Sequence, residues 1–210
     1  MQITSITQTS PGRFTVGLED GSEIKSTLGV ITDLRLFSGK DLDEDALAEF
    51  RRSSVRSIAR DKALEYISRR RMSRKELKDK LVQKGQDEDT AEYCAQWLQE
   101  HGFLDDEGYA AAVARHYASK GYGAGRVRAE LSRRGVGREL WEDAIDNMPE
   151  PDDKLQKLIS ARLKDPNDRE QIRKLSASLY RRGYSWEEIR SALRRYSTDL
   201  EESNDLIEDF

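Results

Sequence analysis

Three glycines recur at nearly constant spacing in the chain, and each stands in the same local pattern. Gly85, Gly135 and Gly183 are 50 and 48 residues apart, and each follows a Leu at position minus four and a Lys or Arg at minus one. A glycine directly after an apolar helical stripe is typical of the left-handed residue that ends a helix. A repeat of this length predicts a tandem array of helical units, in which each unit covers its neighbour's apolar face.

The similarity between the three segments extends to apolar positions on both sides of the glycines. Position minus eight is aliphatic in all three, and positions plus six, nine and ten are apolar as well. The residues at minus eight and plus six are Leu77, Val127 and Leu175, and Ala91, Trp141 and Ile189. One unit is therefore two helices, a basic residue with glycine, and a third helix. We expect helices of roughly 10–17 residues, which only tertiary packing can keep folded.

The first 29 residues have a different pattern, in which apolar residues alternate with Thr and Ser. Asp20-Gly21 lies between two such runs and predicts the turn of a β-hairpin. Two or three short strands bury little surface alone, so the hairpin should pack on a helix. The sequence thus predicts a mainly α fold: a tandem array of about three three-helix repeats with a small N-terminal β-hairpin segment.

This pattern divides the chain into five parts. We expect a β-hairpin with a leading helix over 1–58, repeats over 59–104, 105–149 and 150–198, and an acidic tail over 199–210. Two helix starts carry capping boxes, Ser73 with Glu76 and Ser185 with Glu188.

The net charge of −4 hides an uneven distribution. Residues 1–50 hold 4 basic and 9 acidic residues, residues 51–148 hold 20 and 17, residues 149–198 hold 12 and 8, and residues 199–210 hold only 6 acidic ones. A basic middle between acidic ends fits ordinary solvated helix faces, and it also fits a surface that meets a polyanion or a protein partner.

The basic residues beside the glycines have two readings. A cation at position minus one complements the negative end of its helix, which would make Lys84, Arg134 and Arg182 structural. Helix capping does not account for Arg133 and Arg181. Repeated basic features suit a repeating partner, either a phosphate backbone or a protein filament.

Several other classes of protein are excluded or disfavoured. The sequence contains no run of about 18 apolar residues, so we expect no membrane span, and no secretory signal is visible. Cys94 is the only cysteine, so we expect no intrachain disulfide, no multi-cysteine metal site and a reducing cytoplasm. His101 and His116 lack the spacing of a metal or catalytic pair, and we expect no enzyme activity and no cofactor.

Two short motifs resemble ligand sites but have simpler explanations. Asp105-Asp106 is better explained by helix capping than by a metal, because no third acidic ligand has a fixed spacing. Gly121-Tyr-Gly123-Ala-Gly125 follows a helix rather than a strand and lacks a Gly-Lys-Ser/Thr, so it is neither a P-loop nor a dinucleotide site. The helix start with Arg126 and Arg128 nearby could still hold one backbone phosphate.

Taken in order, these motifs resemble the RecX regulatory proteins of bacteria, which modulate the recombinase RecA. The resemblance covers nearly the whole chain. Its pieces are Ser73-x-x-Glu76-Leu77-x-x-x-Leu81-x-x-x-Gly85, Gly102-Phe-Leu-Asp-Asp-x-x-Tyr109-Ala110, Glu130-Leu131-x-x-x-Gly135-Val136 and Arg182-Gly183-Tyr184-Ser185. Met72 departs from the pattern, because members often carry Pro before the Ser.

The resemblance implies a non-enzymatic regulator of recombination, DNA repair and the SOS response that binds the RecA–DNA filament and mostly inhibits its recombinase, ATPase and co-protease activities. We expect a monomer that binds single- or double-stranded DNA weakly when alone. The alternative is a sequence-independent DNA-binding helical module without a specific protein partner. The candidate filament- or DNA-binding residues are Arg69, Arg70, Arg71, Lys75, Lys84, Arg126, Arg128, Arg133, Arg134, Arg181, Arg182, Arg194 and Arg195.

Overall fold

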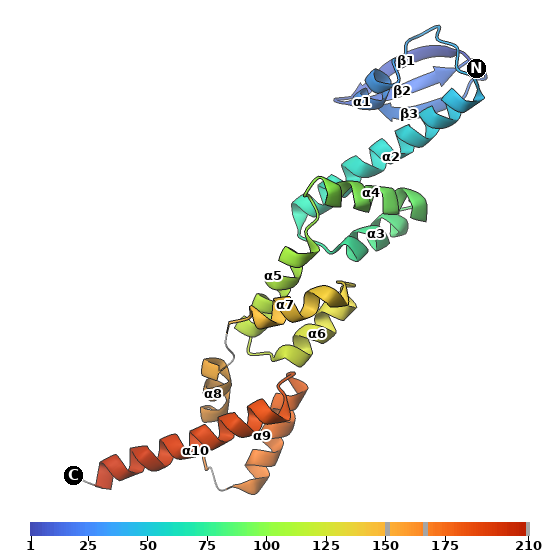
Figure 1. Cartoon of the computed structure of the whole chain (residues 1–210). Helices are drawn as coiled ribbons and strands as arrows, with labels where there is room; N and C mark the ends of the chain where they lie inside the picture. The colour runs from blue at the N-terminus through green and yellow to red at the C-terminus, as the bar shows by residue number, and fades with distance from the viewer. Residues whose placement is uncertain (150–151, 166–167, 209–210) are drawn as a thin grey trace. The chain divides into compact units, whose positions relative to one another are not determined.

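The computed structural model describes residues 1–149, 152–165 and 168–208 (Figure 1). It consists of a small N-terminal sheet followed by helices, and it divides into two compact units, Met1–Asp105 and Asp106–Phe210. The predicted fold class is therefore confirmed. No helix in the described ranges is both long and apolar enough to cross a membrane.

The N-terminal sheet has three antiparallel strands in the order β1-β2-β3, namely Ile3–Ser10, Arg13–Leu18 and Glu23–Thr27. The turn predicted at Asp20-Gly21 joins β2 to β3, and Gly21 adopts the positive φ of 82° that this turn requires. A short helix, α1 (Leu28–Asp33), follows. Ile3, Val16 and Phe50 are fully buried in the core beneath the sheet.

The helix that carries Phe50 is α2, Glu44–Arg69. Its first half packs on the sheet, where the hydroxyls of Ser26 and Ser54 are 2.9 Å apart in a buried hydrogen bond. Its second half supplies Ala59 and Ala63 to the core of the first repeat. At 26 residues, α2 contradicts the expected length of 10–17 residues, and it continues through residues 58 and 59 because no Gly or Pro interrupts it.

The first repeat adds α3 (Arg74–Gln83) and α4 (Glu88–Glu100) to the end of α2. The capping box predicted at Ser73 and Glu76 is present, and Met72, which departs from the family pattern, is buried in the core. Cys94 is also fully buried there. Its burial raises the pKa of the thiol to about 11, which leaves it neutral and unreactive.

The second unit contains the other two repeats. The second repeat is α5 (Asp106–Ser119), α6 (Ala124–Arg133), a 3-10 turn η1 (Arg138–Leu140) and α7 (Trp141–Asp146). The third is α8 (Asp152–Ser160), α9 (Arg169–Arg181) and α10 (Trp186–Glu208). At 23 residues, α10 is also longer than expected, and its backbone includes residues 199–208 of the predicted acidic tail.

The repeat read from the sequence corresponds to three separate helical cores. The equivalent residues Leu81, Leu131 and Leu179 are fully buried, one in each core. The glycines that follow them have φ values of 88°, 66° and 91°, so each ends its helix in the predicted left-handed conformation. The capping box of Ser185 and Glu188 is present at the start of α10, with the Glu188 amide 3.2 Å from the Ser185 hydroxyl.

Candidate functional site

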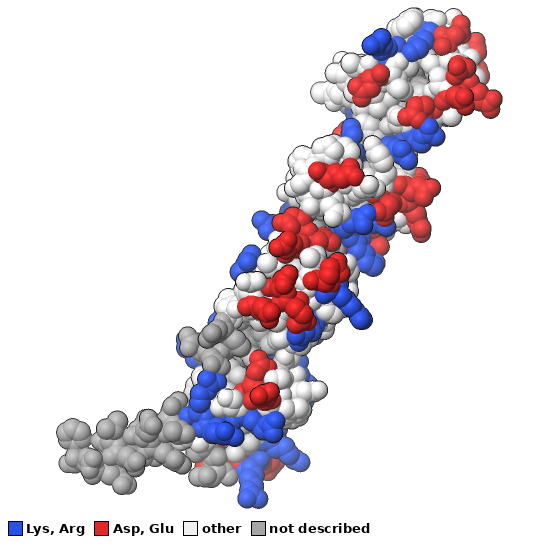
Figure 2. Space-filling model, viewed as in Figure 1, with Lys and Arg blue, Asp and Glu red and all other residues white. Residues whose placement is uncertain are grey.

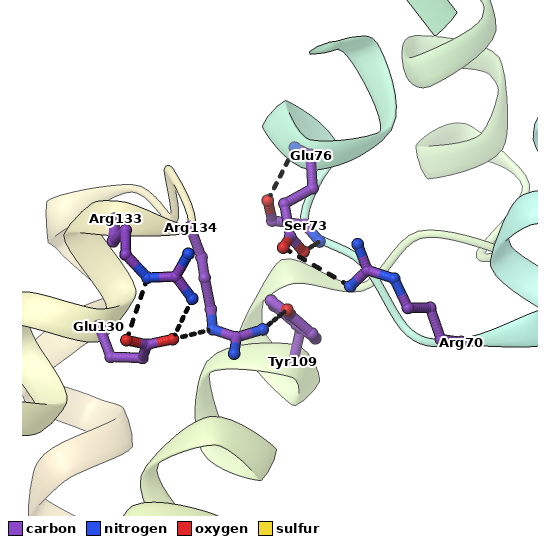
Figure 3. A network of polar contacts seen from close by, with 7 residues as sticks. All are labelled: Arg70, Ser73, Glu76, Tyr109, Glu130, Arg133 and Arg134. Carbon is purple, nitrogen blue, oxygen red and sulfur yellow. Dashed lines mark hydrogen bonds and ion pairs between the residues drawn. The ribbon is translucent and has the colours of Figure 1, made fainter. Parts of the chain in front are cut away.

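The two arginines before Gly135 have different environments at the end of α6. The Glu130 side chain is only 5% exposed, and its carboxylate accepts hydrogen bonds from both Arg133 and Arg134 (Figure 3). The hydrogen bond from Arg133, opposed by burial and aided by Arg134, lowers the pKa of Glu130 to about 2. Arg134 also donates to the hydroxyl of Tyr109 and is largely buried, whereas Arg133 is 67% exposed. Glu130 thus holds one guanidinium inside the repeat and one at the surface.

The same division occurs before Gly183 in the third repeat. Arg182 lies over the ring of Tyr122, 5.3 Å from its centroid, and donates to the Gly121 carbonyl oxygen. Arg181 is exposed at the end of α9 and has no ion-pair partner within the part of the chain that the structure describes. In both repeats the residue at minus one contacts the protein, and the residue at minus two faces solvent.

The candidate residues of the first repeat are exposed, and most have nearby carboxylates. Arg69 pairs with Glu65 and Lys75 with Asp79, both along one turn of helix. Exposed pairs of this kind are worth about 0.3–0.5 kcal/mol, so a polyanionic partner can displace them. Nη1 of Arg70 lies 3.6 Å from Oε1 of the capping residue Glu76 (Figure 3). The other two candidates, Arg71 and Lys84, are exposed.

The remaining candidates lie on α6 and α10. Arg128 forms a two-pronged ion pair with Glu142, with distances of 3.0 and 2.7 Å. Arg126 is exposed and lies over the ring of Tyr122, 5.9 Å from its centroid. Arg194 and Arg195 are exposed on α10. On the face visible in Figure 2, acidic and basic side chains are interspersed within each of the two units.

The glycine-rich segment before α6 has a structural role that the sequence did not reveal. The amide of Gly123 donates to the carbonyl of Arg182 at 3.0 Å, and that of Gly125 donates to the carbonyl of Gly183 at 2.9 Å. A Cβ on Gly123 would lie 2.5 Å from the Gly183 oxygen, so only glycine permits this approach. Because the amides of Gly123 and Gly125 already have acceptors, a phosphate at this helix start would have to be held by the arginine side chains rather than by these two amides.

Sequence reasoning missed a groove beside that contact. It has a volume of about 590 Å³ and lies between α6 and the turn from α9 to α10. Tyr180, Arg126 and Arg181 line the groove. Tyr180 stacks on Trp186, and both rings are more than half exposed. The signal in the sequence was their position: Tyr180 and Trp186 stand at minus three and plus three from Gly183, off the buried stripe.

Comparison with known proteins adds a family to this geometry. Family models described as the first, second and third three-helix domains of RecX match residues 59–98, 105–145 and 150–193. "Regulatory protein RecX" of Xanthomonas axonopodis pv. citri is 38% identical over 137 residues, which cover 63% of this chain and 84% of that protein. The protein of the same name from Vibrio vulnificus is 33% identical over 138 residues, covering 64% of this chain and 90% of that one.

Two solved structures share the fold. One, described as the crystal structure of regulatory protein RecX, has a TM-score of 0.74 at 24% identity and covers 94% of this chain and 98% of its own. RecX from Lactobacillus salivarius has a TM-score of 0.61 at 24% identity and covers 69% and 97%. With three matched domains in order and relatives above 30% identity, the chain belongs to the RecX family of regulatory proteins.

Proposed function

We propose that this protein is a non-enzymatic regulator that binds the RecA–DNA filament and modulates, mostly by inhibition, its recombinase, ATPase and co-protease activities. Membership of the RecX family supports the regulatory role. The observation that carries the binding proposal is the exposed guanidinium of Arg133, held in place by the buried carboxylate of Glu130.

A fixed, exposed guanidinium suits an anionic partner for two reasons. It offers several N–H donors to a carboxylate or phosphate. Because Glu130 already restricts its rotamers, Arg133 loses less side-chain entropy on binding than a free arginine does, and that loss otherwise costs about 0.5–1.5 kcal/mol. Arg181 presents a second guanidinium at the equivalent position of the third repeat.

The test is RecA ATPase activity on single-stranded DNA with the protein added well below one copy per recombinase subunit. We expect the rate to fall at these ratios and the protein to bind the filament more tightly than bare DNA. Arg133→Ala with Arg181→Ala should weaken both effects, whereas Lys174→Ala, which removes a 70% exposed cation paired with Glu170, should not. Circular dichroism checks that each variant keeps its helices.

The runner-up is a sequence-independent DNA-binding module without a specific protein partner. Such a module would bind bare DNA and filament equally, lose affinity steeply with salt, and inhibit the ATPase only when it occupies most of the DNA. Equal binding together with no effect at low ratios would therefore contradict the regulator and favour this alternative.

The proposal includes a cytoplasmic monomer, since the partner is a DNA filament and the buried Cys94 needs no oxidising compartment. Light scattering coupled to size-exclusion chromatography would give a mass near 24.1 kDa if the protein is a monomer. A mass of twice that value would contradict this part of the proposal.

A further inference from the structure

Tyr180 and Trp186 form an unusual surface feature of the third repeat. Their ring centroids are 5.0 Å apart and their planes differ by 17°, so the rings lie nearly parallel. Tyr180 is 53% exposed and Trp186 is 51% exposed. Among the described residues, no other stacked pair has both rings more than half exposed. Neither ring contributes to the core of the repeat, so core packing does not explain them.

The two rings are held in place by the turn that connects their helices. Tyr180 lies in the last turn of α9 and Trp186 is the first residue of α10. Gly183 closes the turn, Tyr184 between them is 2% exposed, and the capping box of Ser185 fixes the start of α10. A ring pair fixed in this way loses little conformational freedom when a ligand binds.

The groove beside Tyr180 carries more basic than acidic side chains. It is lined by Arg126 and Arg128 from α6 and by Arg181 from α9. Arg126 and Arg181 are exposed and have no ion-pair partner in the described ranges, while Arg128 is paired with Glu142. The acidic residue of the groove, Glu188, already accepts a hydrogen bond from the Ser185 amide at 2.6 Å. The groove therefore combines flat aromatic surface with two available guanidinium groups.

We propose that Tyr180 and Trp186 are a stacking platform for the bases of single-stranded nucleic acid, with Arg126 and Arg181 contacting the adjacent phosphates. Stacking on protein aromatic rings beside a basic groove is how single strands are held without sequence preference. A duplex fits the platform poorly, because its bases are already stacked on each other. This proposal rests on the function proposed above, of which it names the DNA contact.

The test is binding of the full-length protein to fluorescein-labelled oligothymidylate, measured by anisotropy at low salt. We expect Trp186→Ala and Tyr180→Ala each to weaken binding about 5- to 150-fold, the effect usual for loss of one stacked base. Trp186→Phe keeps a ring and should retain most of the affinity. Phe37→Ala removes an equally exposed ring, 60% accessible, from the N-terminal unit and should change nothing.

Three results would overturn the platform: no binding of the wild-type protein to oligothymidylate, wild-type affinity in both alanine variants, or equal binding of the wild-type protein to duplex and single strand. Circular dichroism of the two alanine variants checks that weaker binding does not come from misfolding. We expect both to fold normally, because both rings are exposed.

The RecA ATPase assay separates this proposal from the proposed function. If Trp186→Ala binds oligothymidylate normally but no longer affects the ATPase, the rings contact protein, and the platform is wrong while the regulator stands. If the wild-type protein does not affect the ATPase but Trp186→Ala loses oligothymidylate binding, the regulator is wrong and the platform stands.

Discussion

Replacing Gly183 with Ala should destabilise the contact between α6 and the turn from α9 to α10. Gly183 has a φ of 91°, a conformation that costs a residue with a Cβ about 1–3 kcal/mol. The added Cβ would also lie 2.2 Å from the backbone nitrogen of Arg126 and 3.0 Å from its Cα. Because these are backbone atoms, a side-chain rotation cannot relieve the clash, and α6 has to move away.

Gly85→Ala is a matched control for the backbone strain. Gly85 has a φ of 88°, but a Cβ there meets no atom within 4 Å. The difference in the free energy of unfolding between the two variants therefore gives the cost of the clash alone. Overpacking of this kind costs about 1–3 kcal/mol. Displacing α6 also breaks the hydrogen bonds from the Gly123 and Gly125 amides, each worth about 0.5–1.5 kcal/mol. We expect the free energy of unfolding to fall by roughly 2–6 kcal/mol more in Gly183→Ala than in Gly85→Ala.

Amide hydrogen exchange measured by mass spectrometry tests this directly. In Gly183→Ala, a peptide covering residues 121–127 should exchange at least about 30-fold faster than in the wild-type protein, since 2 kcal/mol corresponds to that factor. The same peptide should be unaffected in Gly85→Ala. Equal exchange in the two variants would mean that the glycine contact does not hold α6 in place, and the reasoning would be refuted.

Two further predictions concern titratable groups. The lowered pKa of Glu130, about 2, means that its contribution to stability is fully present above about pH 4.3 and is lost as the pH falls through 2. Glu130→Gln should therefore lower the midpoint of urea unfolding at pH 7 and have little effect on it at pH 2. The exposed control Glu187→Gln should have little effect at either pH. An unchanged midpoint for Glu130→Gln at pH 7 would contradict a stabilising role of the Glu130 ion pairs. Because burial raises the pKa of Cys94 to about 11, iodoacetamide should label the folded protein at pH 8 far more slowly than the protein in urea, and equal rates would show that the thiol is accessible.

Local signals made much of the fold predictable. The positive φ of Gly85, Gly135 and Gly183 and the capping box of Ser73 follow from residues within a few positions of one another. The predicted length of α2 was wrong because the apolar residues that pack on the sheet give way, along the same helix, to apolar residues that pack on the first repeat. No breaker lies between the two, so a change of packing partner was mistaken for a change of helix.

The candidate site was less predictable, because long-range contacts decide which arginine is available. Arg128 resembles Arg126 in the sequence, yet Glu142, fourteen residues away, pairs with only one of them. The acceptors of the Gly123 amide and the exposure of Trp186 likewise depend on how the second and third repeats pack. Residue type identifies basic segments, but it does not separate structural arginines from those that face solvent.

In the second and third repeats, the position of an arginine relative to the capping glycine does distinguish structural arginines from those that face solvent. Adjacent residues at a helix end point about 100° apart, so when Arg134 or Arg182 packs inward, the residue before it faces outward. In the first repeat that outward position is Gln83, and the basic residue, Lys84, is itself exposed and lies over no aromatic ring of the described residues. If the outward arginine is what meets the filament, the second and third repeats supply it and the first does not. The repeats are then equivalent in how they fold and unequal in what they present to a partner.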